Sequence, residues 1–165
     1  MLNEFNFFNF IKLFYIFLYL SYMIIITFGT FDLFHIGHLN MINRCKKYGD
    51  KLIVGISTDK LNYSKKNRYP IINEKNRMEI VKNLKAVDEV FFEESLELKE
   101  QYIKKYNADI FIIGDDWKGK FDYINKFCKV IYLPRTSNVS TTDILNGIKR
   151  PIKEMLEDIV KSLND

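Results

Sequence analysis

Apolar runs alternate with amphipathic stretches along most of this chain. Five runs are almost continuously apolar, which is typical of strands buried on both faces. The predicted strands are Met23–Phe28, Lys51–Ser57, Glu89–Phe92, Ile110–Ile113 and Val130–Leu133. Between and after them, helical spacing predicts helices at His38–Tyr48, Glu74–Leu84, Leu98–Tyr106 and Asp122–Phe127, and from Ser140 or Thr141 to Lys149.

This alternation predicts an α/β fold, namely a Rossmann-like doubly wound parallel five-stranded sheet with helices on both faces. The predicted domain spans residues 23–149, and Pro151 is expected to start a separate C-terminal helix within residues 150–165. The polar and basic stretch 58–73 is expected to be irregular. Since ligands of such sheets bind beyond the carboxyl ends of the strands, the residues after each strand are the first candidates for a site.

The first 22 residues form a hydrophobic extension, and three interpretations of it stay open. They are a membrane anchor, a packed or oligomer-forming helix, and a mis-annotated extension before a true start at Met23. A helix over Phe5–Leu20 would be about 24 Å long, which is shorter than the roughly 30 Å hydrocarbon core of a bilayer. The segment lacks the basic start and the cleavage site of a secretory signal.

Composition narrows the classes of protein that this chain can represent. The 165 residues carry a formal net charge of only +4 and no dense basic stripe, so a nucleic-acid partner is not expected. The two cysteines, Cys45 and Cys128, form no CxxC or Cys/His cluster, which argues against zinc. We expect two buried thiols in a reducing compartment, hence a cytoplasmic protein, membrane-associated if residues 1–22 are an anchor.

The loop after the first strand carries both histidines of the chain. The sequence from Gly29 to His38 reads GTFDLFHIGH, which places His35 and His38 three residues apart at the start of a helix. Free backbone N–H groups and the helix dipole favour phosphate there, and imidazoles can donate hydrogen bonds to phosphate oxygens. Gly29 and Gly37 leave room for the backbone to approach a ligand.

A basic cluster, Lys65-Lys66-Asn67-Arg68, follows the second strand, and Arg77 lies on the next helix. In isolation a charge run is most often solvated surface. Its position beyond the carboxyl end of a strand favours a loop that closes on phosphates.

Two further segments follow the fourth and fifth strands. Residues 114–122 read GDDWKGKFD, with two adjacent carboxylates before the only tryptophan of the chain. Residues 135–142 read RTSNVSTT, in which Arg135 offers a planar fork for phosphate oxygens. Ser140 and Thr141 open a helix and can both cap it and bind an anion.

These segments together resemble a known family. GTFD followed by HxGH resembles the nucleotidyltransferase superfamily, and RTSNVSTT resembles the RTxGxSTT motif of its cytidylyltransferases. GDDWKGKFD is similar to the version in the branch that acts on glycerol 3-phosphate. The resemblance runs from about Met23 to about Asn146, with Asn138 in place of a glycine. Asn is the commonest substitute where a left-handed conformation is needed, so we treat this departure as benign.

The resemblance implies a reaction: CMP is transferred from CTP to glycerol 3-phosphate by in-line attack, giving CDP-glycerol and pyrophosphate without a covalent intermediate. It implies catalytic roles for His35, His38, Lys66 and Arg135, with Lys65 as the alternative to Lys66. The implied CTP-binding residues are Gly29, Thr30, Phe31, His35, Gly37, His38, Arg68, Asp116, Arg135, Thr136, Ser140, Thr141 and Thr142. The implied residues for the acceptor are Asp32, Lys66, Arg77 and Lys99.

The resemblance also implies Mg²⁺, or another divalent cation, held mainly by the triphosphate and not by a protein metal site. It implies a homodimer with the HxGH region near the interface. Two alternatives stay open. One is the same chemistry on phosphocholine, phosphoethanolamine or ribitol 5-phosphate. The other is a nucleotide-binding protein without activity, since fold alone does not guarantee catalysis.

Overall fold

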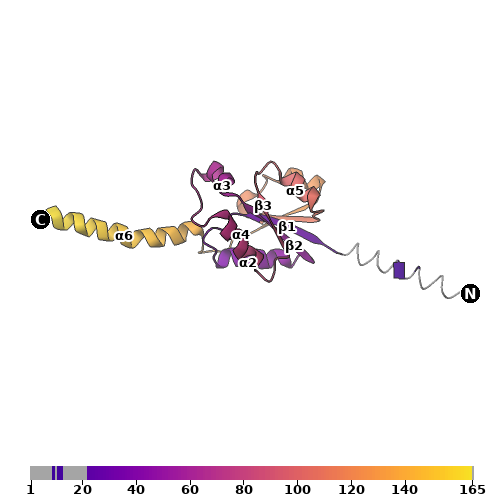
Figure 1. Ribbon diagram of the computed structural model, residues 1–165, viewed down its shortest axis with the longest axis horizontal. Helices are drawn as coiled ribbons and strands as arrows, with labels where there is room; N and C mark the ends of the chain where they lie inside the picture. The colour runs from indigo at the N-terminus through magenta and orange to yellow at the C-terminus, as the bar shows by residue number, and fades with distance from the viewer. Residues whose placement is uncertain (1–8, 10, 13–21, 165) are drawn as a thin grey trace, which may run out of the picture.

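The computed structural model describes residues 22–164 together with Asn9, Ile11 and Lys12. Its five strands form one parallel sheet in the order β3-β2-β1-β4-β5 (Figure 1). The strands are β1 (Ile24–Gly29), β2 (Lys51–Ser57), β3 (Glu89–Glu93), β4 (Ile110–Gly114) and β5 (Lys129–Leu133). The helices are α2 (Ile36–Lys46), α3 (Asp59–Lys66), α4 (Glu74–Lys82), α5 (Lys99–Lys105), the short η1 (Asp115–Trp117) and η2 (Asp122–Lys126), and α6 (Thr141–Asn164). The predicted fold is confirmed.

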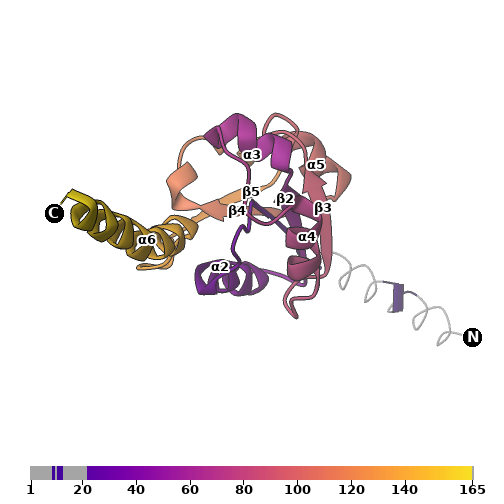
Figure 2. The same ribbon diagram turned by 60° about the vertical axis from the view of Figure 1, so that its left-hand side comes forward.

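The sheet is covered on both faces, and each face has its own core. Successive side chains of a strand point to opposite faces, so the β1 neighbours Ile25 and Ile26 enter different cores. Ile25 packs with Ile42 of α2 and Val81 of α4, whereas Ile26 belongs to the core that holds Ile103 of α5. Figure 2 shows α2 and α4 below the sheet and α3 and α5 above it.

The strand order positions the site. From β1 the chain winds outward through β2 to β3, and then returns to the other side of β1 to form β4 and β5. The direction of winding therefore reverses between β1 and β4, where the connections leave in opposite directions and open a crevice. The loops after β1 and β4 flank this crevice at the carboxyl end of the sheet.

Two predictions about helices are wrong. The stretch 58–73 is not wholly irregular, because residues 59–66 form α3. The Thr58 side chain accepts a hydrogen bond from the Leu61 N–H at 3.1 Å, and Leu61 is buried. This N-cap and one apolar anchor suffice for a short helix, which ends at Asn67 in the left-handed conformation (φ 51°). The helix predicted from His38 begins two residues earlier, with His35 as its N-cap.

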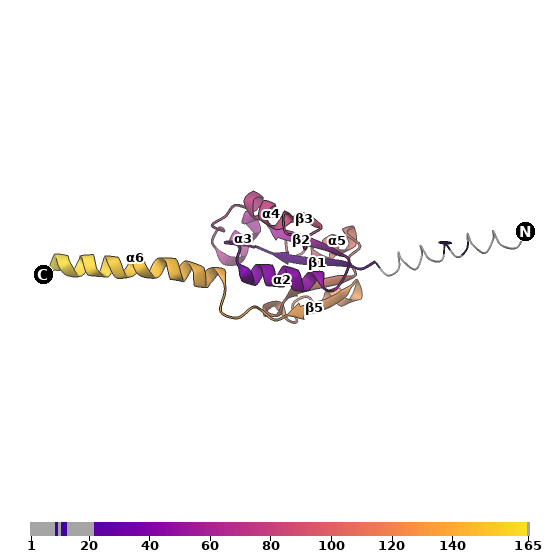
Figure 3. The same ribbon diagram turned by 90° about the horizontal axis from the view of Figure 1, so that it is seen from below.

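The C-terminal segment is also different from the prediction. Instead of ending at Lys149 and restarting at Pro151, one helix, α6, continues through Pro151. A proline inside a helix removes one hydrogen bond and crowds the preceding turn. The preceding turn here carries Gly147, and apart from its chain neighbours and the helix's own nearby backbone a Cβ added there would have no atom within 4 Å. Figures 1 and 3 show α6 projecting away from the sheet along the long axis.

Most of residues 1–22 lie outside the described part of the chain, so the three interpretations of this segment stay predictions. No helix among the described residues is long and apolar enough to cross a membrane.

Both cysteines are buried and unpaired, as expected. Burial raises the pKa of Cys45 to about 12 and that of Cys128 to about 11, which keeps both thiols protonated and unreactive.

Candidate active site

A cavity of about 470 Å³ opens at the carboxyl end of the sheet. Its lining comes from the segments that follow all five strands, and includes every site residue predicted from sequence except Arg77. These are Gly29, Thr30, Phe31, Asp32, His35, Gly37, His38, Lys66, Arg68, Lys99, Asp116, Arg135, Thr136, Ser140, Thr141 and Thr142. The structure therefore brings together segments that are more than 100 residues apart in sequence, such as Asp32 and Thr141, whose side-chain hydroxyl donates to the Asp32 carbonyl at 2.9 Å.

The two histidines are stacked at the start of α2, with ring centroids 3.8 Å apart. The His35 Nδ1 accepts a hydrogen bond from the Gly37 N–H at 3.1 Å, and the His38 Nδ1 accepts from the His35 N–H at 3.4 Å. A neutral imidazole has one donor and one acceptor nitrogen. Because both Nδ1 atoms accept, the proton of each ring is on Nε2, which leaves two N–H donors for a ligand.

Both rings are neutral at pH 7. Burial lowers the pKa of His38 to about 3, and the adjacent His35 adds to this effect while Asp32 opposes it. Burial and then Arg135 also lower the pKa of His35. A neutral stacked pair avoids repulsion between two imidazolium ions, and a bound polyphosphate would favour partial protonation.

The connection between β1 and α2 is conformationally unusual. Phe31 and Leu33 have positive φ angles of 56° and 45°, which non-glycine residues seldom adopt. Gly37 packs tightly on the site, since a Cβ there would lie 2.9 Å from the His35 Cε1. Gly37 is thus required for the position of the imidazole as well as for access of backbone to a ligand.

Arg77 and Asp32 hold the loops of the site. Arg77 is fully buried and does not line the cavity, in contrast to its predicted contact with the acceptor. Its guanidinium donates to the carbonyls of Ile72 and Thr30 and to the Asp59 carboxylate. The Asp32 carboxylate accepts from three backbone N–H groups, those of Leu33, Ile71 and Ile72, at 2.9 to 3.1 Å. Both side chains use their hydrogen-bonding groups on the protein itself, which fits a positioning role.

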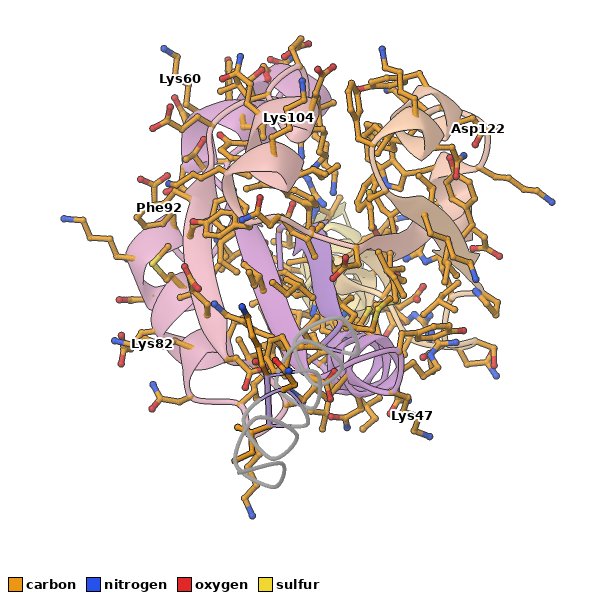
Figure 4. The ribbon with its side chains drawn as sticks, turned by 90° about the vertical axis from the view of Figure 1, so that its right-hand side faces the viewer. Lys47, Lys60, Lys82, Phe92, Lys104 and Asp122 are labelled. Atoms are coloured by element: carbon orange, nitrogen blue, oxygen red, sulfur yellow. The ribbon has the colours of Figure 1, made fainter. Side chains whose placement is uncertain are left out.

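Four basic residues reach the cavity from two directions. Lys65 and Lys66 come from the end of α3, Arg68 follows them, and Arg135 comes from the loop after β5. Lys65 is the more enclosed of the two lysines, and burial lowers its pKa, whereas Lys66 is exposed. Both line the cavity, so the structure does not select one of them. Of the other helix lysines, Lys60 points outward from the domain (Figure 4), and Lys104 pairs with Glu100 of its own helix at 2.6 Å.

Lys99 lies at the first turn of α5 and is almost completely buried. Its ammonium group pairs with the carboxylate of Glu93, the last residue of β3, and lies 3.2 Å from the centroid of the Phe28 ring. Burial lowers the pKa of Lys99 to about 8, and Glu93 opposes this shift. Sequence reasoning missed Glu93. The available signal was a carboxylate directly after the apolar run of the third strand.

Sequence reasoning also missed Ser57 and Asn62, both buried lining residues. The Asn62 Oδ1 accepts from the Thr30 hydroxyl at 2.9 Å. Its Nδ2 is buried and has no hydrogen-bond partner within the described part of the chain. Asn62 lies on α3, where an irregular loop was expected, so no helical face could be assigned to it from sequence.

The 114–122 segment contributes Gly114, Asp116, Trp117 and Phe121 to the lining. Asp116 is exposed in η1, and its Oδ1 would lie 2.4 Å from a Cβ added at Gly114. Glycine at that position leaves space for this carboxylate. Asp122 accepts from the Tyr132 hydroxyl at 2.7 Å and therefore anchors the far end of the segment, on the outside of the domain (Figure 4).

The 135–142 segment forms a turn that leads into α6. Asn138 has a φ of 61°, which confirms the predicted left-handed conformation. Ser140 caps α6, because its Oγ accepts from the Asp143 N–H at 3.1 Å. Arg44 of α2 donates to the Pro134 carbonyl at 2.7 Å and fixes the start of this segment.

Among the described residues, no group of three or more His, Cys, Asp or Glu side chains is placed to hold a metal ion. Asp116 and Glu93 are the acidic side chains besides Asp32 that line the cavity, and the Glu93 carboxylate is paired with Lys99.

Comparison with known proteins agrees with this geometry. The profile of the cytidylyltransferase-like family matches residues 26–148. The chain belongs to this family. Two related proteins are named glycerol-3-phosphate cytidylyltransferase. The one from Bacillus spizizenii is 49% identical over 104 residues, and the match covers 63% of this chain and 80% of the relative. One from Staphylococcus aureus is 40% identical over 104 residues, covering 63% and 78%.

A solved structure of a lipopolysaccharide core biosynthesis protein from Thermoplasma volcanium has the same fold. It is 24% identical with a TM-score of 0.63, and the match covers 70% of this chain and 98% of that one. The matched cytidylyltransferase-like region thus coincides with the sheet and its site, and ends within the first turns of α6.

Proposed function

We propose that this protein transfers CMP from CTP to glycerol 3-phosphate and releases pyrophosphate. The observation that carries the transfer chemistry is the pair of neutral, Nε2-protonated histidines at the start of α2. Two N–H donors beside a helix N-terminus suit the oxygens of a polyphosphate. The proposed acceptor has two sources of support. Relatives at 40–49% identity are named glycerol-3-phosphate cytidylyltransferase, and the GDDWKGKFD segment is similar to the version in that branch.

In the proposed reaction, a phosphate oxygen of glycerol 3-phosphate attacks the α-phosphorus of CTP. The new P–O bond forms as the bond to the bridging oxygen breaks, and pyrophosphate leaves with that oxygen and its electron pair. His35 and His38 donate hydrogen bonds to oxygens whose negative charge grows, while Lys66 and Arg135 orient the phosphates. Catalysis then rests on positioning and electrostatic stabilisation, without a covalent intermediate.

A divalent cation is part of the proposal. The lining of the cavity is mainly cationic and neutral, so the described residues fit a cation that is carried by the triphosphate oxygens and water, with Asp116 as the exposed carboxylate available to it. Such a cation would neutralise charge on the leaving pyrophosphate.

We also propose that the protein is a homodimer, and that it pairs through α6 and not through the HxGH region that the resemblance implies. Large apolar side chains form an exposed stripe on this helix, namely Ile148, Ile152, Met155, Leu156 and Val160. Within the middle of α6, residues 149–158, three basic residues (Lys149, Arg150 and Lys153) come before three acidic ones (Glu154, Glu157 and Asp158), while Asp143 precedes this stretch and Lys161 follows it. Antiparallel pairing with a second copy would bury the stripe and set the basic half beside the acidic half. The opposed helix dipoles favour the same direction.

The function is tested by pyrophosphate release from CTP and Mg²⁺ with four acceptors in parallel: glycerol 3-phosphate, phosphocholine, phosphoethanolamine and ribitol 5-phosphate. We expect a strong preference in kcat/KM for glycerol 3-phosphate. Turnover of another acceptor in preference would move the substrate assignment while keeping the chemistry. CTP binding without turnover of any acceptor would contradict the proposed activity and favour a binding protein.

A further inference from the structure

Two stacked tyrosines lie at the mouth of the cavity. Tyr63 is on α3, and Tyr69 belongs to residues 67–70, which follow this helix and are called the rim segment below. The two rings are 4.7 Å apart between centroids, with an angle of 28° between their planes. Tyr63 is 44% exposed and Tyr69 is 63% exposed, and neither ring belongs to the two cores of the sheet. Core packing therefore does not explain the pair.

The rim segment is tethered at both of its ends. At the first end, the Asn67 N–H donates to the Tyr63 carbonyl at 2.8 Å, and the left-handed conformation of Asn67 ends α3. Beyond the second end, the N–H groups of Ile71 and Ile72 donate to the Asp32 carboxylate at 3.0 and 2.9 Å. The segment thus connects α3, which carries the lysines, to the loop that carries the histidines.

Between these tethers, the ring stack is the contact that restrains the segment. Arg68, Tyr69 and Pro70 all line the cavity, but none of them makes a hydrogen bond within the described part of the chain. The pyrrolidine ring fixes the φ angle of Pro70. The backbone of Arg68 and Tyr69 is left to the stack, and the stacked rings offset part of the conformational entropy that ordering these residues costs.

Arg68 needs such a restraint because of the charges around it. Lys65 and Lys66 reach the same cavity from the last turn of α3. Like charges repel each other, so in the free protein an unrestrained Arg68 would turn away from these lysines into solvent. A stack at the next residue keeps the Arg68 backbone at the cavity, and the guanidinium is then in place before a phosphate arrives.

Resting on the proposed function, we infer that Tyr63 and Tyr69 are positioning residues that hold Arg68 at the phosphates of CTP. The stack organises the free protein for binding, so its loss weakens the affinity for CTP and leaves the chemical step unchanged. The restraint comes from the rings alone, because neither phenol hydroxyl makes a hydrogen bond among the described residues.

The first test removes one ring in Tyr63→Leu. Isothermal titration calorimetry with CTP and Mg²⁺, without an acceptor, measures the Kd. We expect the Kd to rise about three- to tenfold, which corresponds to the loss of one aromatic pair. The kcat at saturating CTP should stay within about twofold of the wild type. Tyr63→Phe keeps the ring and should restore the wild-type Kd. Tyr48→Leu is the matched control, since this exposed tyrosine follows α2 and does not line the cavity.

The second test asks whether the stack acts through Arg68. Arg68→Gln alone should raise the Kd for CTP by about tenfold, as expected for the loss of a cation that binds phosphate. Adding Tyr63→Leu to Arg68→Gln should then change the Kd by less than about twofold, because the stack no longer positions a binding group.

The inference is overturned if folded Tyr63→Leu binds CTP as tightly as the wild type, with folding checked by far-UV circular dichroism. It is also overturned if the effects of Tyr63→Leu and Arg68→Gln are additive, as they would be if the ring supported α3 and its lysines instead. A loss of affinity in Tyr69→Leu alone would show that the Tyr69 ring contacts the ligand directly, which overturns the inference as well.

If Tyr63→Leu does not fold, the cycle of Tyr69→Leu with Arg68→Gln decides the question. CTP binding by the wild type without pyrophosphate release would contradict the proposed function and leave this inference in place. A wild-type protein that does not bind CTP would overturn both.

Discussion

Two imidazoles define the chemistry of this site at the scale of single residues. Each Nδ1 accepts a backbone hydrogen bond, so each Nε2 carries a proton, and both residues line the cavity. His35 is at the same time the N-cap of α2. The residue that begins the helix therefore also presents a donor to the anion that the helix N-terminus attracts.

Replacement of His38 by alanine removes one of these donors without a large change in the fold. We expect kcat to fall by about 100-fold or more, in line with the loss of one oxyanion-type donor. Pyrophosphate release measures the effect, and far-UV circular dichroism checks folding. Lys47→Ala, an exposed change at the other end of α2, is the control and should leave kcat unaltered. A near-native rate for His38→Ala would remove this residue from the mechanism.

The lowered pKa of His38 predicts a pH dependence of stability. In the unfolded chain the imidazole takes up a proton near pH 6.5, but in the folded protein only near pH 3. The unfolded state thus binds more protons between these values, so stability is fully present above pH 6.5 and is lost as the pH falls through this window.

Urea denaturation at pH 7 and pH 5 measures this loss. The free energy of unfolding should fall less between the two pH values in His38→Gln than in the wild type, because glutamine does not titrate. An equal fall in both proteins would show that other groups cause the acid sensitivity.

At the scale of elements, the site is a set of short connections that the sheet holds in place. The β1–α2 loop carries the histidines, α3 carries the lysines, and the turn after β5 carries Arg135 and the cap of α6. Left-handed residues end or redirect several of these connections, with Asn67 after α3 and Asn138 before α6. The side chain of Asn tolerates this conformation better than a β-branched side chain does.

The turn before α6 gives a prediction at this scale. Asn138→Val should destabilise the protein by about 1–2 kcal/mol, the usual cost of a left-handed residue with a Cβ. It should also raise the KM for CTP, because Arg135 and Ser140 flank the turn. Asn138→Gly is the matched control and should leave stability and KM close to the wild type. Chemical denaturation and steady-state kinetics provide the two readouts, and equal behaviour of the two variants would argue against a conformational requirement.

At the scale of the whole molecule, α6 extends beyond the domain that its first residues help to complete (Figures 1 and 3). The Thr141 hydroxyl bonds to Asp32 at the site, while the exposed apolar stripe begins two turns later. A second copy bound to α6 would therefore be joined through one continuous helix to the edge of the cavity.

Two charged substitutions in the stripe, Ile152→Glu with Met155→Glu in the full chain, should convert the proposed dimer into a monomer. Size-exclusion chromatography with light scattering measures the mass. Asn146→Ala changes an exposed polar residue of the same helix that belongs neither to the stripe nor to its charged halves, and should keep the mass of the wild type. A monomeric wild type, or a stripe variant that stays dimeric, would contradict pairing through α6.

Several features follow from the sequence alone because they depend on local periodicity and local chemistry. Solid apolar runs identified the five strands and hence the parallel sheet, and the position of HxGH after the first strand placed both histidines at a helix start. The left-handed conformation of Asn138 was also predictable, because the resemblance implies a glycine there and Asn is the commonest substitute for a left-handed glycine. All but one of the predicted site residues line the cavity for the same reason: the carboxyl ends of parallel strands meet at one edge.

Tertiary structure decided what depends on contacts between distant segments. Arg77 has the same charge as the lysines of the site, but its donors are used by Ile72, Thr30 and Asp59. Glu93 lines the cavity, and its pairing with Lys99 and Ser57 brings together the ends of β2 and β3 and the start of α5. The short helix α3 formed where the local pattern indicated a loop. The helical periodicity of residues 59–66 is weak, but the burial of Leu61 outweighs it. Which polar groups are left to meet a ligand is settled by three-dimensional packing, and periodicity carries no information about it.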